Sequence, residues 1–178
     1  MFNGSVYYYE NKELGKLRML HLFKAKHDGN MQRIVIAPPM QKAELEKFLR
    51  TDVICGECGF ENFTNADFEH FPDTWRGPDL FLSWIKTEYG KQGKGLATDA
   101  LRAIAMVAEQ QQQNILRLIA FPEDSKFYKK LGFRLDKQDP KDKLLHKAVI
   151  RKSAFADFSQ FKKDEELTEL TKEILFSN

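Results

Sequence analysis

A short basic loop is the part of this chain whose residue types could do chemistry. Residues 88–95 contain three glycines and two lysines, and the segment ends in the order G-K-Q-G-K-G. Glycines let several backbone N–H groups converge on one anion, and the lysines add full positive charges. A helical pattern follows directly, and the first N–H groups of a helix have no partner within it. This combination predicts a phosphate or pyrophosphate site. The alternative is a surface loop that is only glycine-rich and basic.

Two strands and two helices are expected to position this loop. Leu80–Thr87 is a nearly continuous apolar run, which predicts a strand covered on both faces. A helix is expected from Leu96 to a stop near Asn114, because its apolar residues recur every three or four positions. A second strand over Ile115–Phe121 and a short helix ended by Gly132 complete a βαβα unit.

The loop does not fit two other nucleotide-binding patterns well. A Walker A loop needs Lys and Ser or Thr directly after its last glycine, but Gly95 is followed by Leu96 and Ala97. A dinucleotide fingerprint needs a third glycine where Thr98 stands. A dinucleotide-binding oxidoreductase therefore stays open only as a less favoured alternative.

Two motifs resemble those of the GNAT superfamily of acyl-CoA-dependent N-acyltransferases. Residues 92–97, Q-G-K-G-L-A, match the Q/R-x-x-G-x-G/A motif, which in that family cradles the coenzyme A pyrophosphate. Residues 127–133, F-Y-K-K-L-G-F, resemble the family segment F-Y-x-K-x-G-F. The resemblance covers Leu80–Leu135 and extends loosely to a closing strand over Leu144–Ile150.

The resemblance implies a fold and a reaction. The expected fold is an α/β (α+β) domain over residues 1–152, with a mixed, mostly antiparallel central sheet and helices on both faces. A helical extension over residues 153–178 is expected to pack on the same domain. The implied reaction moves an acetyl group directly from acetyl-CoA to an amine of a small molecule, peptide or protein. It passes through a tetrahedral intermediate and uses no metal.

The resemblance also implies roles for individual residues. Tyr128 would donate a proton to the departing thiolate. The residues expected to bind acetyl-CoA lie on the first strand, in the loop and in the short helix: Ile85, Lys86, Thr87, Gln92, Gly93, Lys94, Gly95, Leu96, Ala97, Thr98, Phe127 and Lys130. The asparagine that the family often carries upstream of the tyrosine is replaced here by Phe121.

The acceptor amine must lose a proton before it attacks. An amine with a pKa of about 10.4 is almost wholly protonated at neutral pH. A general base is therefore useful, and Glu88 and Glu57 are the candidates. A backbone N–H of the first strand is expected to stabilise the oxyanion. If no base is present, the chain could instead be a catalytically silent acyl-CoA-binding or interaction module.

Composition limits the other function classes. The chain has 178 residues, 42% hydrophobic and 30% charged, which fits one soluble domain with a real core. Its net charge of +2 does not suggest nucleic-acid binding. No signal peptide or long apolar run is present, so we expect no membrane partner and a cytoplasmic location. The two cysteines, Cys55 and Cys58, are interpreted as ordinary thiols.

The flanking regions show weaker patterns. Residues 1–39 are expected to form three strands, Met40–Leu49 a helix and Val53–Phe60 a strand. Residues 61–79 are interpreted as a loop, either a cap on the core or an acidic wall of an amine pocket. The tail is expected to be helical, with Asp164–Glu166 at a helix start. It would pack on its own domain, form a dimer contact or close over the acceptor site.

Overall fold

Three antiparallel strands precede the first helix: β1 (Phe2–Asn11), β2 (Gly15–Lys26) and β3 (Gly29–Ala37). This computed structural model describes residues 2–26, 29–54, 62–70, 79–135, 146–151 and 159–177. The other elements are α1 (Lys42–Phe48), a wider helical turn over Leu49–Ile54, β4 (Thr64–His70), β5 (Leu80–Thr87), α2 (Leu96–Gln110), β6 (Ile115–Ala120), a 3₁₀ turn over Pro122–Asp124, α3 (Ser125–Lys130), β7 (Arg134–Leu135), β8 (His146–Arg151), β9 (Lys162–Lys163) and α4 (Glu165–Phe176).

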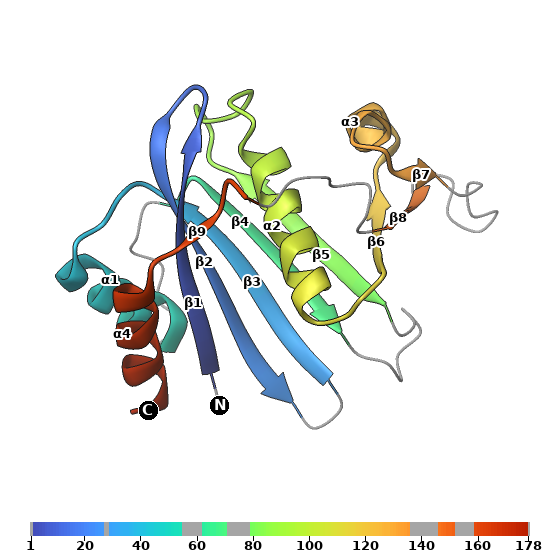
Figure 1. The fold of residues 1–178 in the computed structure, drawn as a ribbon. Coiled ribbons are helices and arrows are strands. Elements are labelled where there is room, and N and C mark those ends of the chain that lie inside the picture. The colour runs from blue at the N-terminus through green and yellow to red at the C-terminus, as the bar shows by residue number, and fades with distance from the viewer. Residues whose placement is uncertain are drawn as a thin grey trace.

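The described strands join one sheet in the order β7-β8-β6-β5-β4-β3-β2-β1-β9. Neighbouring strands are antiparallel except β5 and β6, which are parallel. A parallel pair needs a crossover connection, and α2 supplies it. Helices lie on both faces of the sheet (Figure 1). The expected fold class, a mixed and mostly antiparallel sheet between helices, is therefore confirmed.

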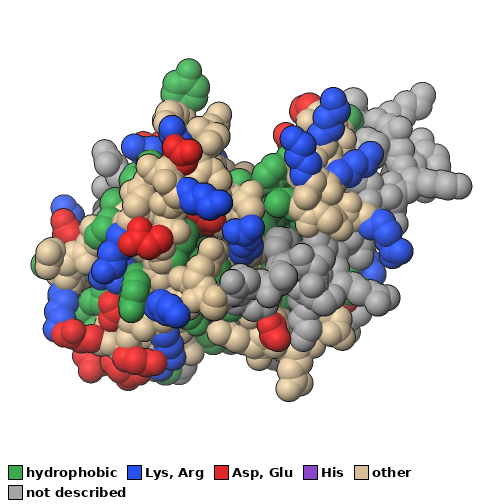
Figure 2. Space-filling model, turned by 45° about the horizontal axis from the view of Figure 1, so that its top comes forward, with side chains coloured by type: hydrophobic (Ala, Val, Ile, Leu, Met, Phe, Trp, Pro, Cys, Tyr) green, Lys and Arg blue, Asp and Glu red, His purple; other side chains and the backbone are tan. Residues whose placement is uncertain are grey.

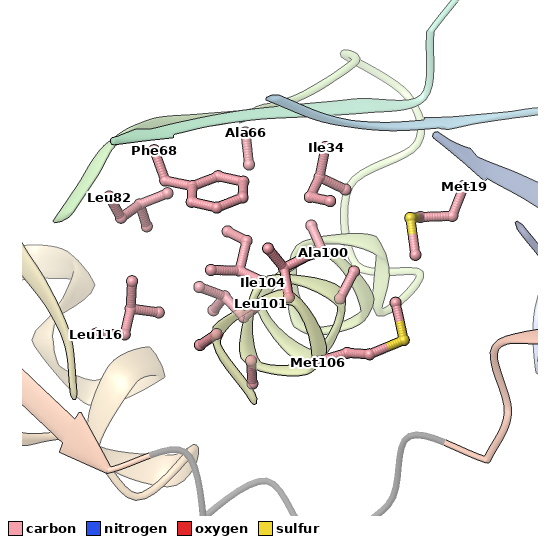
Figure 3. Packing of buried hydrophobic residues seen from close by; sticks show 14 of the residues in the cluster. Met19, Ile34, Ala66, Phe68, Leu82, Ala100, Leu101, Ile104, Met106 and Leu116 are labelled. Atoms are coloured by element: carbon pink, nitrogen blue, oxygen red, sulfur yellow. The ribbon is translucent and has the colours of Figure 1, made fainter. Parts of the chain in front are cut away.

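Helix α2 packs across one face of the sheet and forms the larger core. Its side chains at Leu101 and Ile104 have no exposed surface. Figure 3 shows them beneath Ile34, Ala66 and Phe68, which come from the strands β3 and β4. Burying one such aliphatic side chain contributes about 1.5–3 kcal/mol, so this packing fixes where the N-terminus of α2 lies.

The opposite face carries a second, smaller core under α1 and α4. Leu45 and Phe48 of α1 meet Leu167 and Ile174 of α4 there, over Val35 of β3. Helix α4 runs beside β1 (Figure 1). The C-terminal helix is thus part of the packed core.

The start of α4 follows its sequence signals. The side chain of Asp164 accepts a hydrogen bond from the N–H of Leu167 at 3.0 Å. Glu165 and Glu166 occupy the first turn, where negative charge complements the helix dipole. The predicted helix start at Asp164–Glu166 is confirmed.

Helix α4 also closes part of the open edge of β1. The N–H of Val6 donates to Oγ1 of Thr168 at 2.9 Å in a buried contact. At Gly4 the helix comes so close that a Cβ atom would lie 2.8 Å from Cγ2 of Thr171. The glycine is needed here for close packing.

Side-chain amides fix the C-terminal end of α2. Gln111 and Gln32 exchange two side-chain hydrogen bonds, at 2.8 and 2.9 Å. Oε1 of Gln32 also accepts from Nε2 of His21 at 2.7 Å. The His21 ring stacks between Phe23 and Phe68, with centroid distances of 5.9 and 6.1 Å. Burial lowers the pKa of His21 to about 4, and the hydrogen bond that His21 donates to Gln32 opposes this only in part.

The interpretation of residues 61–79 as a loop was wrong for β4. Thr64, Ala66 and Phe68 are buried and alternate with half-buried polar residues, and Ala66 and Phe68 belong to the core under α2. Asp67 and Glu69 point to the other face, and their charges hid the alternation. Residues 71–78 lie outside the described part of the chain.

Two other boundaries differ from the predictions. Val53 and Ile54 continue the helical turn begun at Leu49, whose side chain is fully buried, so the predicted strand does not start there. The rest of that predicted strand, with Cys55 and Cys58, falls outside the described residues. Helix α2 ends at Gln110, and the left-handed residue is Gln112 (φ 57°) instead of Asn114.

Candidate functional site

The strands β5 and β6 separate halfway along β5. They pair only from Leu80 to Leu82, and within the described residues the stretch from Trp84 to Thr87 pairs with β4 alone. Ser83 is an extra residue at a register shift against Asp67, and such a bulge bends a strand. The separation leaves backbone groups of β5 open on the side of β6.

This separation corrects one expectation about β5. Leu80, Phe81 and Leu82 are buried, but Ser83 and Trp84 are exposed, and Trp84 retains 42% of its surface. The strand is therefore covered on both faces only as far as Leu82. The predicted binding residues Ile85, Lys86 and Thr87 lie in the uncovered half, with Lys86 facing solvent.

The glycine-rich loop lies at this end of β5 and enters α2 in the predicted way. Gly90, Gly93 and Gly95 all have positive φ values, of 90°, 76° and 79°. No hydrogen bond between described residues uses the N–H groups of Gly95, Leu96, Ala97 or Thr98. The first helical bond runs from the N–H of Asp99 to the carbonyl of Gly95, at 2.9 Å. Several donors at a helix N-terminus are thus available to an anion.

Positive side chains surround the space between this loop and α3. Lys91 lies over the ring of Phe63, 5.0 Å from its centroid, and Lys94 is half-buried. Figure 2 shows the surface hollowed between two lobes, with lysine and arginine side chains gathered on the lobe that carries α3. The exposed cations of α3 and β7 are Lys126, Lys129, Lys130 and Arg134. This charge suits a ligand with several phosphate charges.

Tyr128 is buried, with 7% of its surface exposed, whereas Phe127 is only partly buried. The reason is the end of α3: the N–H of Phe133 donates to the carbonyl of Tyr128 at 3.0 Å, and that of Gly132 to Lys129 at 3.0 Å. This reversal at Gly132 (φ 90°) places the ring of Phe133 5.4 Å from that of Tyr128.

The environment of Tyr128 makes its hydroxyl harder to ionise. Burial, and secondarily the negative charge of Asp124, raise the pKa of Tyr128 to about 12. No hydrogen bond between described residues engages this hydroxyl. A protonated phenol of this kind can serve as a proton donor at neutral pH.

The two candidate bases are placed very differently. Glu88 is exposed at the start of the loop, where its N–H donates to the carbonyl of Phe63 at 2.9 Å. Glu57 lies outside the described residues. The acidic residues next to β4 and β5 are engaged: Arg33 pairs with Asp67 at 2.6 Å, and Arg117 with Asp79 at 2.9 Å. Because Asp67 and Asp79 are paired with arginines, they add little negative charge to the predicted acidic wall of an amine pocket.

One buried group near the loop was not foreseen from the sequence. Asp99, in the first turn of α2, accepts hydrogen bonds at its Oδ2 from the hydroxyl of Tyr9 and from Nδ2 of Asn11, both at 2.8 Å. Burial raises the pKa of Asp99, and the two hydrogen bonds, from Asn11 first and then Tyr9, oppose that rise. The same negative charge, after burial, raises the pKa of Tyr9. Among Tyr9, Asn11 and Asp99, only Asn11 carries a signal in the sequence, because asparagine is typical of turns.

The fold has known counterparts among solved structures. The chain superimposes on spermidine N-acetyltransferase from Vibrio cholerae, solved with CoA and spermine, with a TM-score of 0.51, 13% identity, and coverage of 74% of this chain and 71% of that one. The GNAT domain of S. lividans PAT gives a TM-score of 0.48 at 13% identity, over 72% and 65% of the two chains. A Desulfovibrio desulfuricans protein assigned to the GNAT acetyltransferases gives 0.47 at 13%, over 68% and 67%.

No protein-family model matches the sequence, and no curated protein sequence matches it. The structure thus has the GNAT fold, and the resemblance seen in the two motifs is confirmed at the level of the fold. In the described part of the chain, no helix is both long and apolar enough to cross a membrane.

Proposed function

We propose that this protein is an acyl-CoA-dependent N-acetyltransferase. One observation carries the proposal: β5 leaves β6 after Leu82 at the same end of the sheet where the N–H groups of residues 95–98 have no partner among the described residues. The open backbone of β5 suits the amide groups of pantetheine, and the helix N-terminus suits a pyrophosphate. Acetyl-CoA contains both, joined in one chain.

The residues present fit the rest of the ligand. Lys91 and Lys94 supply positive charge beside the loop, and Lys130 supplies it on α3. Gly93 and Gly95 hold positive φ values, which lets the backbone approach the phosphates. Gln92 is exposed at the loop, and Phe127 is partly buried on α3.

In the proposed reaction, an amine nitrogen forms a bond to the thioester carbonyl carbon and the carbon–sulfur bond breaks. The proton lost by the amine goes to a base, for which Glu88 and Glu57 are the candidates. A backbone N–H of β5 faces the oxyanion of the tetrahedral intermediate. Tyr128, whose pKa of about 12 leaves it protonated at neutral pH, donates its proton to the departing thiolate. The products are the N-acetylated amine and free CoA.

We propose a small-molecule or peptide amine as the acceptor. Polyamines are the first class to test, because the superimposed Vibrio cholerae enzyme was solved with spermine. That enzyme shares only 13% identity with this chain, so primary amines of other sizes and N-terminal peptides belong in the same screen.

The first experiment measures ligand binding by thermal shift and calorimetry with CoA, acetyl-CoA, NADPH and ATP. A ligand at 100 times its Kd adds about 2.7 kcal/mol to the free energy of unfolding. At this chain length, that raises Tm by several degrees. Stabilisation by both CoA species but not by NADPH is expected. Stabilisation by NADPH alone would favour the oxidoreductase, and no stabilisation by any of the four would overturn the proposal.

The second experiment measures thiol release from acetyl-CoA in the presence of each amine. Amine-dependent release, with an acetylated amine detected by mass spectrometry, is the expected result. CoA binding without release for any amine in the screen would instead identify a silent acyl-CoA-binding module.

A further inference from the structure

Asn11 connects the first hairpin of the chain to the glycine-rich loop. Its side chain is buried and makes four hydrogen bonds. Nδ2 donates to the carbonyl of Lys94 at 2.9 Å and to Oδ2 of Asp99 at 2.8 Å. Oδ1 accepts from the N–H groups of Glu13 and Leu14, at 2.9 and 3.0 Å. The amide nitrogen of Asn11 donates twice and its oxygen accepts twice, and this fixes the orientation of the amide.

The contact with Lys94 sets the direction of the next N–H group. In a trans peptide the carbonyl of one residue and the N–H of the next point in opposite directions in one plane. Because Asn11 holds the Lys94 carbonyl, the N–H of Gly95 points away from Asn11. That N–H has no partner among the described residues. Gly95 can adopt this arrangement because its φ of 79° suits a residue without a side chain.

Asn11 also stabilises a buried group next to the loop. The Asp99 carboxylate is buried in the first turn of α2, where burial alone disfavours its charged form. Asn11 and Tyr9 both aim a donor at its Oδ2. Tyr9 is held in turn by the ring of Phe161, at 5.2 Å between centroids. The donors stabilise the carboxylate without adding a positive charge.

We propose that Asn11 is a positioning residue for the pyrophosphate of the acyl-CoA: by holding the Lys94 carbonyl, it orients the Gly95 N–H toward the phosphate oxygens. The inference rests on the proposed function and adds to it a residue on β1, outside both sequence motifs. The alternative is that Asn11 only shapes the β1–β2 turn through its hydrogen bonds with Glu13 and Leu14.

Two variants separate the contact with Lys94 from the general loss of a buried hydrogen bond. Asn11→Ala removes the donors to Lys94 and to Asp99, together with the acceptor of the Glu13 and Leu14 N–H groups. Tyr9→Phe removes only the other donor to the same Asp99 oxygen, at the same distance of 2.8 Å, and leaves Lys94 untouched. Tyr9→Phe is therefore a matched control for the general loss of a buried hydrogen bond.

The measurement is the Kd for CoA by calorimetry, with Tm of each ligand-free protein. We expect Asn11→Ala to raise Kd by about tenfold, the scale of one hydrogen bond to a charged group. Tyr9→Phe should change Kd by less than about twofold. With an identified acceptor, Asn11→Ala should raise KM for acetyl-CoA and leave kcat nearly unchanged. Equal Kd changes in both variants, or none in Asn11→Ala, would overturn the inference.

A second measurement needs no variant and tests the orientation of the Gly95 N–H even if Asn11→Ala does not fold. In the unsubstituted protein, the amide proton resonance of Gly95 should move downfield when CoA is added, because a phosphate oxygen becomes its acceptor. An unchanged Gly95 resonance with saturating CoA would refute the inference while leaving the acetyltransferase proposal intact. If the unsubstituted protein does not bind CoA at all, both fail together.

Discussion

The buried imidazole of His21 should make the protein lose stability as the pH falls from 7.5 to 5. Its pKa is about 4 in the folded protein, against a usual value of 6.5. The unfolded chain therefore takes up a proton below pH 6.5, while the folded protein does so only near pH 4. Stability is fully present above pH 6.5, declines between pH 6.5 and 4, and levels off below that range.

The size of the effect follows from the two pKa values. The full difference of 2.5 units corresponds to about 3 kcal/mol. Between pH 7.5 and pH 5, the part that is lost is about 2 kcal/mol. The substitution His21→Gln removes the titrating group and keeps a polar end near Gln32. It should cost about 1–2 kcal/mol at pH 7.5, from lost stacking and an altered hydrogen bond.

The assay is urea unfolding of both proteins at pH 7.5, 6 and 5. The free energy of unfolding of the unsubstituted protein should fall by about 2 kcal/mol more than that of His21→Gln over this range. Comparing the two proteins cancels the contributions of other groups, including Asp99, which both contain. Parallel pH profiles would refute the argument, because they would mean that His21 titrates alike in the folded and unfolded states.

Three further substitutions test the site and the packing. Tyr128→Phe should lower kcat by about 10²-fold, the usual effect of one general acid, while the Kd for CoA stays the same; unchanged turnover would remove Tyr128 from the mechanism. Gly95→Ala and Gly15→Ala both place a side chain at positive φ, 79° and 75°, so both should destabilise the protein, but only Gly95→Ala should weaken CoA binding in a titration. Gly4→Ala should lower the free energy of unfolding by about 1–3 kcal/mol, because its Cβ would lie 2.8 Å from Thr171; a neutral result in urea unfolding would show that α4 can move away.

The elements around the loop could be predicted because their signals are local. The apolar run of β5, the spacing of apolar residues in α2 and the reversal at Gly132 each depend on neighbours in sequence, and the structure has all three. Positive φ at Gly93 and Gly95 follows from the same kind of signal. Local patterns therefore located the candidate phosphate site.

The contacts that the sequence did not indicate join residues that are far apart in the chain. Asn11 reaches Lys94 and Asp99 across more than eighty positions of sequence, at separations of 83 and 88. Such contacts follow only from the order of strands in the sheet. The strand β4 was missed for a different reason, since its half-buried acidic residues resemble those of a loop.

The closure of β1 by α4 has a consequence for the protein during its synthesis. Val6 and Thr168, which share a buried hydrogen bond, are 162 positions apart. At translation rates of about 5–20 residues per second, Thr168 is made roughly 8 to 30 s after Val6. During that interval the N–H of Val6 has no partner from α4, and unpaired strand edges are sites of aggregation. A nascent chain stalled before residue 159 should therefore depend on chaperones more than the finished protein does.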